Sequence, residues 1–191
     1  MRLLEQKILT DGVVLPGHIL KVNSFLNQQV DVGLLMELGK EIKSTFEKDG
    51  VNKILTLEAS GIAIAAAFAA VMDVPMVFAK KSSAKNLSGD ILTQTVHSYT
   101  HNKDYDIVVE KRFLGKGDRV LIVDDFLANG AALSGLINMV NESGAELVAC
   151  VPAIEKGFQG GGDSLREKGI RVESLAIVES MDDEGNITFR K

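Results

Sequence analysis

The sequence predicts an α/β protein with a mostly parallel sheet and helices on both of its faces. Segments rich in apolar residues recur along the chain at 53–57, 75–80, 119–124, 146–154 and 171–178. Between them lie segments with helical periodicity or with small, helix-forming residues. Because each apolar segment is apolar on both faces, we interpret all five as strands of a parallel sheet that helices cover on both sides.

Three helices are expected next to these strands. In residues 31–49, apolar side chains recur every three or four positions with charged ones between them, which predicts an amphipathic helix. An alanine-rich segment that ends near residue 72 predicts a second helix, and residues from about 130 to 142 predict a third. No repeat or linker interrupts the alternation, so we expect residues 1–191 to form one domain.

Two segments fall outside this alternation. Residues 81–105 are polar and rich in hydroxyl groups, and a connection of this length in a compact domain is typical of a flexible functional loop. We expect residues 106–113 to form the strand that returns from it. Residues 1–30 are too apolar for a free tail, and we expect them to form a hood over one end of the sheet.

Composition narrows the classes of function. The net charge of −5 argues against nucleic acid and anionic membranes as partners, because both attract basic surfaces. The longest apolar stretch, residues 62–72, is shorter than the about 18 residues that span a bilayer. The N-terminus does not resemble a secretory signal, and the single cysteine, Cys150, lies in an apolar run typical of a buried thiol. We therefore expect a cytoplasmic protein.

The most informative turn follows the third predicted strand. Asp124 and Asp125 end that strand, and five small or short residues then open a helix: Ala128, Asn129, Gly130, Ala131 and Ala132. Free N–H groups at the start of a helix bind phosphate, and small side chains let an anion approach them. Two carboxylates would repel that phosphate, so we expect them to accept hydrogen bonds from sugar hydroxyls or to hold Mg²⁺ through water. The turn therefore predicts a sugar-phosphate site.

This turn resembles the signature of the type I phosphoribosyltransferases. The resemblance implies that Asp124 and Asp125 contact the ribose hydroxyls of phosphoribosyl pyrophosphate (PRPP) and that the following loop holds its 5-phosphate. It also implies a Mg²⁺ ion that is bound mainly by PRPP and not by the protein. The chain departs from the commonest motif, since Asn129 stands before Gly130 and alanines follow it, which leaves fewer hydroxyls for the phosphate. The competing interpretation is an ordinary turn with two solvated aspartates and a helix cap.

The resemblance extends to two segments that would bind pyrophosphate. The turn after the first strand matches the position where the family holds pyrophosphate on backbone N–H groups, here those of Ala59, Ser60 and Gly61. Lys80 and Lys81 end the second strand, where the family often places a basic residue that reaches pyrophosphate in its own or a neighbouring subunit. The alternatives are a tight turn in which Ser60 caps the helix and a solvated strand end.

The polar segment 81–105 corresponds to the flexible catalytic loop of the family, whose Ser-Tyr element matches Ser98 and Tyr99. Closure of such a loop would exclude water from the reacting ribose and prevent hydrolysis of PRPP. His97 and His101 have no cysteine near them, so no metal site made of protein ligands is expected. The family usually forms homodimers, which makes a homodimer the expected assembly.

Residues 127–130, Leu-Ala-Asn-Gly, are similar to the form found in members that use xanthine. The purine-binding residues of these members match Leu20, Asn27 and Lys156, with the Asn27 amide at the 2-oxo group and Lys156 at the 6-oxo group. Without the resemblance, Lys156 is an ordinary charged loop residue, and Gln28 stands where a histidine is expected. The implied reaction transfers a phosphoribosyl group to N9 of xanthine and gives xanthosine monophosphate (XMP). Hypoxanthine, guanine or adenine as the base, or a PRPP-binding regulator without catalysis, remain the alternatives.

Overall fold

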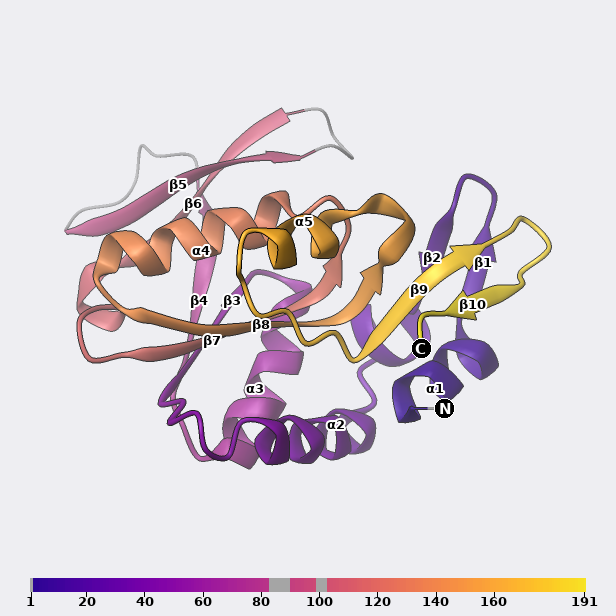
Figure 1. Cartoon of the computed structure of the whole chain (residues 1–191), viewed down its shortest axis with the longest axis horizontal. Helices are drawn as coiled ribbons and strands as arrows, with labels where there is room; N and C mark the ends of the chain where they lie inside the picture. The colour runs from indigo at the N-terminus through magenta and orange to yellow at the C-terminus, as the bar shows by residue number, and fades with distance from the viewer. Residues whose placement is uncertain (1, 83–89, 99–102) are drawn as a thin grey trace.

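A single large sheet forms the centre of the protein (Figure 1). The computed structural model describes residues 2–82, 90–98 and 103–191, and in these residues eight strands pair in the order β10-β9-β8-β7-β3-β4-β6-β5. The five central strands are parallel: β3 (Lys53–Leu57), β4 (Met76–Ser82), β7 (Arg119–Leu127), β8 (Glu146–Lys156) and β9 (Ala176–Met181). The antiparallel strands at the edges are β5 (Ile91–Ser98), β6 (Lys103–Glu110) and β10 (Ile187–Phe189). This confirms the predicted α/β class.

Helices cover both faces of the sheet. The helices α2 (Val32–Thr45) and α3 (Ser60–Met72) lie on one face, and α4 (Ala131–Ser143) and α5 (Gly161–Glu167) lie on the other (Figure 1). Each face has its own apolar core, so the sheet is buried on both sides, as the apolar strands predicted. Two single-turn 3-10 helices, Lys111–Phe113 and Gly157–Gln159, follow β6 and β8.

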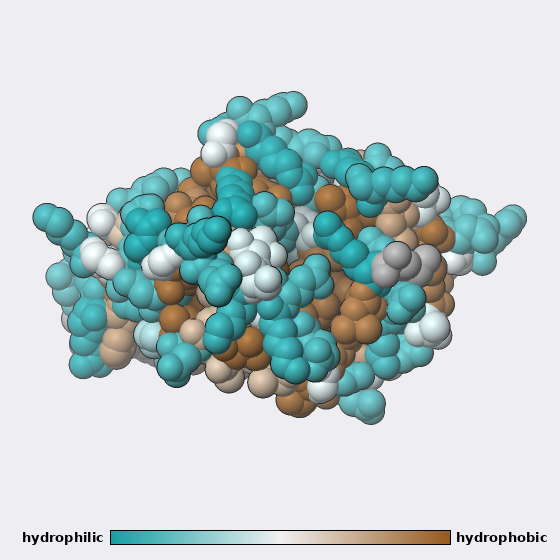
Figure 2. All heavy atoms as spheres, turned by 60° about the horizontal axis from the view of Figure 1, so that its bottom comes forward, coloured by the Kyte–Doolittle hydropathy of each residue, from teal (hydrophilic) through white to brown (hydrophobic). Residues whose placement is uncertain are grey.

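Local sequence explains how α2 forms. Asp31 caps the helix, because its Oδ1 atom accepts a hydrogen bond from the Leu34 N–H at 3.0 Å. Leu38 and Ile42 are buried on the inner side of the helix. The bottom of the molecule in Figure 1, where α2 lies, is turned forward in Figure 2, and on this face polar side chains separate apolar patches. The helix ends at Thr45, a few residues before the predicted end, because residues 46–50 form a turn.

The interpretation of residues 81–105 as one long loop is wrong for much of the segment. Residues 91–98 form β5, which pairs with β6 along its whole length. Leu92 and Val96 are buried, whereas Thr93 and Thr95 between them are exposed, the alternating pattern of a strand with one buried face. Val96 packs against α4, where a Cβ on Gly135 would lie 2.6 Å from the Val96 Cγ2 atom. The polar composition of the segment therefore hid a strand that tertiary packing stabilises.

The fifth predicted strand, 171–178, begins later than expected. The strand β9 starts at Ala176, and before it Val172 makes only an isolated bridge to Cys150. Residues of this approach use their polar groups for side-chain contacts, since the Val172 carbonyl and the Ser174 hydroxyl both lie within hydrogen-bond distance of Arg166. The backbone of this segment nevertheless stays bonded to β8, since the Glu173 N–H donates to the Cys150 carbonyl at 2.9 Å and the Leu175 N–H donates to the Pro152 carbonyl at 3.1 Å.

The N-terminal hood lies beside β9 and β10 at one end of the sheet (Figure 1). It consists of α1 (Leu3–Asp11), β1 (Val13–Leu15), β2 (Ile19–Lys21) and a single π-helical turn, Asn23–Asn27. The Arg2 guanidinium donates to the Ser174 carbonyl at 2.8 Å, and His18 Nδ1 lies 3.2 Å from the Met181 carbonyl. These contacts join the first residues of the chain to β9 and the segment before it.

Two further expectations concern burial. Cys150 is buried in β8, and burial together with the charge of Asp124 raises the pKa of its thiol to about 12. Among the helices of the described residues, none is long and apolar enough to cross a membrane.

Candidate functional site

Two strand-to-helix turns meet at the carboxyl ends of β3 and β7. These strands are adjacent and parallel, with Leu55 opposite Ile122. The strand β7 continues to Leu127, so Asp124 and Asp125 lie within it and not at its end, where the sequence predicts them. Gly61 is the second residue of α3, and a Cβ added to it would lie 3.2 Å from the Asp124 Oδ1 atom and would overlap the Thr56 hydroxyl. Only glycine therefore lets the two turns approach this closely. The structure brings together the predicted pyrophosphate turn and the predicted acidic pair.

Asp124 is buried, with 6% of its surface exposed, whereas Asp125 is half-buried. The Asp124 Oδ1 atom accepts a hydrogen bond from the Asp125 N–H at 3.0 Å. Burial and, to a smaller extent, the charge of Asp125 raise the pKa of Asp124 well above its usual value, while the charge of Lys81 opposes this shift. The site thus holds a poorly solvated carboxyl group that a hydroxyl donor would stabilise in its ionised form.

The loop after β7 carries the residues predicted to hold a phosphate. Gly130 has a φ of +87°, which glycine adopts without strain, and it directly precedes α4. The Asn129 Oδ1 atom accepts a hydrogen bond from the Ala131 N–H at 3.1 Å, so this amide is engaged in the structure. First-turn N–H groups have no acceptor within their own helix, which leaves Ala132 as a donor for an anion.

A second loop packs against this one. The N–H of Gly161 donates to the Ala128 carbonyl at 3.1 Å, and a Cβ on Gly161 would overlap that carbonyl oxygen. Sequence reasoning missed this contact and the buried carboxylate of Glu155 beneath it. The run of three glycines at 160–162 is the signal that could have found the contact, because glycine runs often mark close backbone approaches.

The turn after β3, predicted to bind pyrophosphate, leads directly into α3. Ala59 precedes the first residue of α3, Ser60, and the peptide between Glu58 and Ala59 is cis. In the described residues, no hydrogen bond from the Ser60 side chain caps α3, so the alternative in which Ser60 is a helix cap is wrong. The Glu58 Oε1 atom accepts a hydrogen bond from the Lys81 N–H at 2.6 Å, which joins this turn to the end of β4.

The two lysines of β4 point to different faces. Lys81 Nζ lies 5.3 Å from the centre of the Tyr105 ring, whereas Lys80 Nζ lies 5.8 Å from the ring of Phe78. Asp124 raises the pKa of Tyr105, with burial as the larger cause, which places Tyr105 and Lys81 in the field of the acidic pair. Lys81 and Tyr105 therefore lie near Asp124, and Tyr105 is a neighbour that sequence reasoning missed; the binding of pyrophosphate by Lys81 stays a prediction.

The predicted loop residues are only partly placed. Ser98 is the last residue of β5, but its side chain and the whole of Tyr99 lie outside the described residues.

Of the predicted base-binding residues, Leu20 and Asn27 belong to the hood and Lys156 is the last residue of β8. Lys156 Nζ donates to the His18 carbonyl at 3.2 Å and lies 5.8 Å from the centre of the Phe126 ring. Burial lowers the pKa of Lys156. Leu20, two residues after His18, is buried with 6% exposure. Phe126, which sequence reasoning missed, therefore adds an aromatic face beside the lysine.

Asn27 carries an unusual polar atom. Its Oδ1 atom is buried and has no hydrogen-bond partner in the described chain. An unpaired buried acceptor costs about 1–3 kcal/mol, so a ligand N–H at this position would be favoured. No hydrogen bond among the described residues joins Asn27 to Lys156, and their meeting around one base remains a prediction.

The site offers few ligands for a metal. No group of three or more histidine, cysteine, aspartate or glutamate side chains in the described residues could hold an ion. Asp124 and Asp125 provide two carboxylates, so a magnesium ion would need most of its oxygen ligands from a bound phosphate compound.

Comparison with known proteins identifies the family. Residues 26–172 match the family model described as "Phosphoribosyl transferase domain". The chain belongs to this family. The match confirms the resemblance seen in the sequence, and it agrees with the mostly parallel sheet.

The sequence similarity to curated phosphoribosyltransferases extends over the whole chain. A xanthine phosphoribosyltransferase of Lachnoclostridium phytofermentans is 53% identical over 191 residues, which is 100% of this chain and 98% of that protein. A xanthine phosphoribosyltransferase of Bifidobacterium adolescentis is also 53% identical and is covered completely, as is this chain.

Solved structures share the fold at lower identity. The adenine phosphoribosyltransferase of Giardia lamblia in complex with 9-deazaadenine has a TM-score of 0.77 at 22% identity, covering 93% of this chain and 98% of that one. The enzyme of Trypanosoma brucei, in complex with AMP, pyrophosphate and ribose 5-phosphate, has a TM-score of 0.79 at 16% identity, covering 96% and 83%. At these identities the likeness shows the fold alone.

Proposed function

We propose that the protein transfers the phosphoribosyl group of PRPP to N9 of xanthine, giving XMP and pyrophosphate. The observation that carries the proposal is the contact between Gly61 and the buried Asp124, which joins a pyrophosphate turn to a ribose-binding acid. The full-length similarity to proteins named xanthine phosphoribosyltransferases supports xanthine as the base.

Each part of PRPP has a proposed partner. Asp124 and Asp125 accept hydrogen bonds from the ribose hydroxyls, and the backbone of residues 128–132 holds the 5-phosphate. The backbone of residues 59–61 and the ammonium of Lys81 hold pyrophosphate. Mg²⁺ would bind mainly to PRPP and supply charge neutralisation to the phosphates when bound.

The chemistry needs placement and electrostatics more than a protein nucleophile. As the bond to pyrophosphate stretches, positive charge develops on the ribose ring, and the carboxylates beside it stabilise that charge. Their partial burial strengthens the effect, because charges interact more strongly where water is excluded. Holding the base against the ribose carbon completes the arrangement.

The base is proposed to lie between Asn27 and Lys156. The unpaired Oδ1 atom of Asn27 accepts from a ring N–H of xanthine, and the same amide donates to the 2-oxo group. Lys156 donates to the 6-oxo group. Hypoxanthine lacks the 2-oxo group, so it leaves an amide donor unpaired in the site.

A direct assay tests this proposal. Purified protein is incubated with PRPP, Mg²⁺ and one of xanthine, hypoxanthine, guanine or adenine, and nucleotide and pyrophosphate are measured. We expect one pyrophosphate per XMP formed and the highest kcat/KM with xanthine. A variant with D124N and D125N should keep its fold and lose turnover. Normal activity in that variant, or a preference for another base, would contradict the proposal.

The proposal includes a homodimer, as the family resemblance implies, and a location in the cytoplasm, as the composition and the N-terminal sequence suggest. The single buried cysteine fits a reducing compartment. Light scattering of the purified protein tests the assembly: a dimer has twice the chain mass of 20.6 kDa, and a monomer would contradict it.

A further inference from the structure

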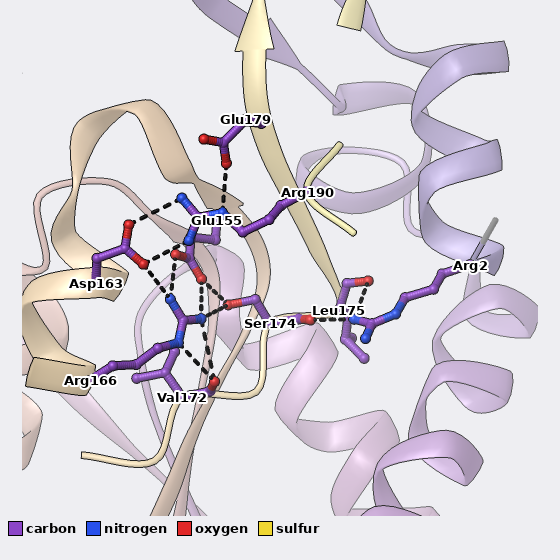
Figure 3. Close-up of polar contacts among 9 residues, drawn as sticks. All are labelled: Arg2, Glu155, Asp163, Arg166, Val172, Ser174, Leu175, Glu179 and Arg190. Carbon is purple, nitrogen blue, oxygen red and sulfur yellow. Dashed lines mark hydrogen bonds and ion pairs between the residues drawn. The ribbon is translucent and has the colours of Figure 1, made fainter. Parts of the chain in front are cut away.

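Residues 128–132, which are proposed to hold the 5-phosphate, are called the phosphate loop. Figure 3 shows a charged network that is joined to this loop through the start of α5. Its centre is Glu155 in β8, which is 0% exposed and receives two hydrogen bonds from Arg166 of α5, Nη1 to Oε1 at 2.9 Å and Nη2 to Oε2 at 2.7 Å. Arg166 also donates to Asp163 at 3.1 Å, and the Ser174 hydroxyl donates to Glu155. A buried ion pair contributes little net stability, so the Glu155–Arg166 pair is more important for the position of the backbone around it.

Glu155 and the phosphate loop are joined through the start of α5. A Cβ on Gly162 would overlap the Glu155 carboxylate, so the backbone of α5 lies directly against it. The preceding residue, Gly161, donates its N–H to the Ala128 carbonyl at 3.1 Å. Glu155 is also opposite Leu127 in the β7–β8 pair, next to Ala128 in the chain. The Glu155 carboxylate thus contacts the backbone at Gly162, and the adjacent Gly161 is hydrogen-bonded to Ala128.

The network extends to the hood end of the sheet. Arg190, after β10, donates to both oxygens of Asp163 at 2.7 and 3.1 Å and to Glu179 of β9 at 2.6 Å. Arg2 donates to the Ser174 carbonyl at 2.8 Å. Figure 3 shows Arg190 beside Asp163 and Glu179, and Arg2 at the carbonyls of Ser174 and Leu175, on the far side of Ser174 from Arg166. The start of α5 is therefore anchored on two sides.

Planarity of the peptide bond connects this anchor to anion binding. The carbonyl of Ala128 and the N–H of Asn129 belong to one trans peptide unit, in which they point in opposite directions. When Gly161 holds the Ala128 carbonyl, the Asn129 N–H is therefore aimed away from α5. This N–H is one of the groups assigned above to the 5-phosphate of PRPP.

We infer that Arg166 is a positioning residue for PRPP. Through Glu155 and Gly161 it fixes the orientation of the Ala128–Asn129 peptide, and so prepares the loop to bind the 5-phosphate. The inference rests on the proposed function, in which residues 128–132 hold that phosphate.

The test is the variant R166K, measured for PRPP binding by calorimetry and for steady-state kinetics with PRPP and xanthine. Lysine keeps the charge that compensates Glu155 but lacks the two-pronged guanidinium. We expect the Kd and KM for PRPP to rise about tenfold, with a smaller change in kcat and in the KM for xanthine. The amide of Gly161 should exchange its hydrogen faster, which a loss of fold elsewhere would not produce selectively.

R171K is the matched control. Arg171 also binds two acids, Glu173 and Asp49, at 3.0 Å each, but within the described residues no hydrogen bond or ion pair joins its side chain to α5 or to the phosphate loop. It should bind PRPP like the wild type. If R166K folds poorly, the double variant E155Q/R166Q replaces the ion pair without leaving a buried charge and should show the same weakened PRPP binding.

The outcomes separate the two proposals. Folded R166K or E155Q/R166Q with the PRPP affinity of R171K would overturn the positioning role of Arg166. Failure of the wild type to bind PRPP would instead overturn the proposed function.

Discussion

Asp124, which is proposed to bind ribose, acts against the stability of the fold. It is buried, and no ion pair in the described residues joins it to a cation. Its raised pKa means that the folded protein binds a proton more tightly than the unfolded chain does. Stability that comes from protonated Asp124 is therefore present at low pH and is lost as the pH rises through the pKa of the folded state.

The variant D124N should be more stable than the wild type at neutral pH, because asparagine cannot ionise. The difference in unfolding free energy should grow as the pH rises above the value of about 3.9 for an unfolded aspartate. Urea unfolding between pH 4 and pH 8 measures this. If the unfolding free energies of the two proteins had the same pH dependence, ionisation of Asp124 would not destabilise the fold, and the prediction would be wrong.

D163N is the control of opposite sign. Hydrogen bonds from Arg190 lower the pKa of Asp163, so its contribution is present at neutral pH and is lost as the pH falls through the pKa of the folded state. D163N should be less stable than the wild type at pH 7, and the difference should shrink in acid.

Asn27 should determine the preference for xanthine. Replacing it with alanine removes the amide proposed to pair with the 2-oxo group, while hypoxanthine has no such group to lose. The ratio of kcat/KM for xanthine over hypoxanthine should fall about tenfold, or about 1.4 kcal/mol. Q28A changes the neighbouring exposed residue and should leave the ratio unaltered. An unchanged ratio in N27A would mean that the base is recognised elsewhere.

At the level of elements, α4 links the phosphate loop to the β5–β6 hairpin. The helix begins at the loop, and β5 packs on it where Gly135 leaves no space for a side chain. The nearest atoms to an added Cβ are Val96 Cγ2 at 2.6 Å and Ile107 Cδ1 at 3.3 Å. The hairpin that leads to the predicted catalytic loop is therefore supported by the helix that follows the acidic pair.

The variant G135A should push β5 away from α4 and lower the unfolding free energy by about 1–3 kcal/mol, as overpacking does. V96A should restore part of this loss, since it removes the methyl groups that collide. G33A is the control: its Cβ would meet only Asp31 Oδ1, at 3.5 Å, so the gain in helix propensity should stabilise α2 by up to about 1 kcal/mol. Equal effects of G135A and G33A in urea unfolding would contradict the packing argument.

The whole molecule is built around a sheet with cores on both faces, and Cys150 lies at its centre. The thiol is 0% exposed in β8, between β7 and β9. With its pKa raised to about 12 and no other cysteine in the chain, it reports on global opening of the sheet.

Labelling of Cys150 by a disulfide reagent at pH 8 should be slow and should follow the unfolding equilibrium. PRPP at 100 times its Kd should slow labelling about 100-fold, because it stabilises the folded state by about 2.7 kcal/mol. The urea-unfolded chain should react at one rate with and without PRPP. Fast labelling of the native protein would indicate local opening around β8.

Local patterns in the chain were enough to predict the central strands, the three main helices and the two turns at Asp124 and Gly61, because periodicity and turn chemistry act between near neighbours. The polar strand at 91–98, the late start of β9 and the Glu155–Arg166 network could not be predicted in this way. Each depends on contacts between residues distant in the sequence, such as Val96 with Gly135 or Gly161 with Ala128. Burial and close backbone approach arise from tertiary packing, which brings together residues that no local sequence pattern connects.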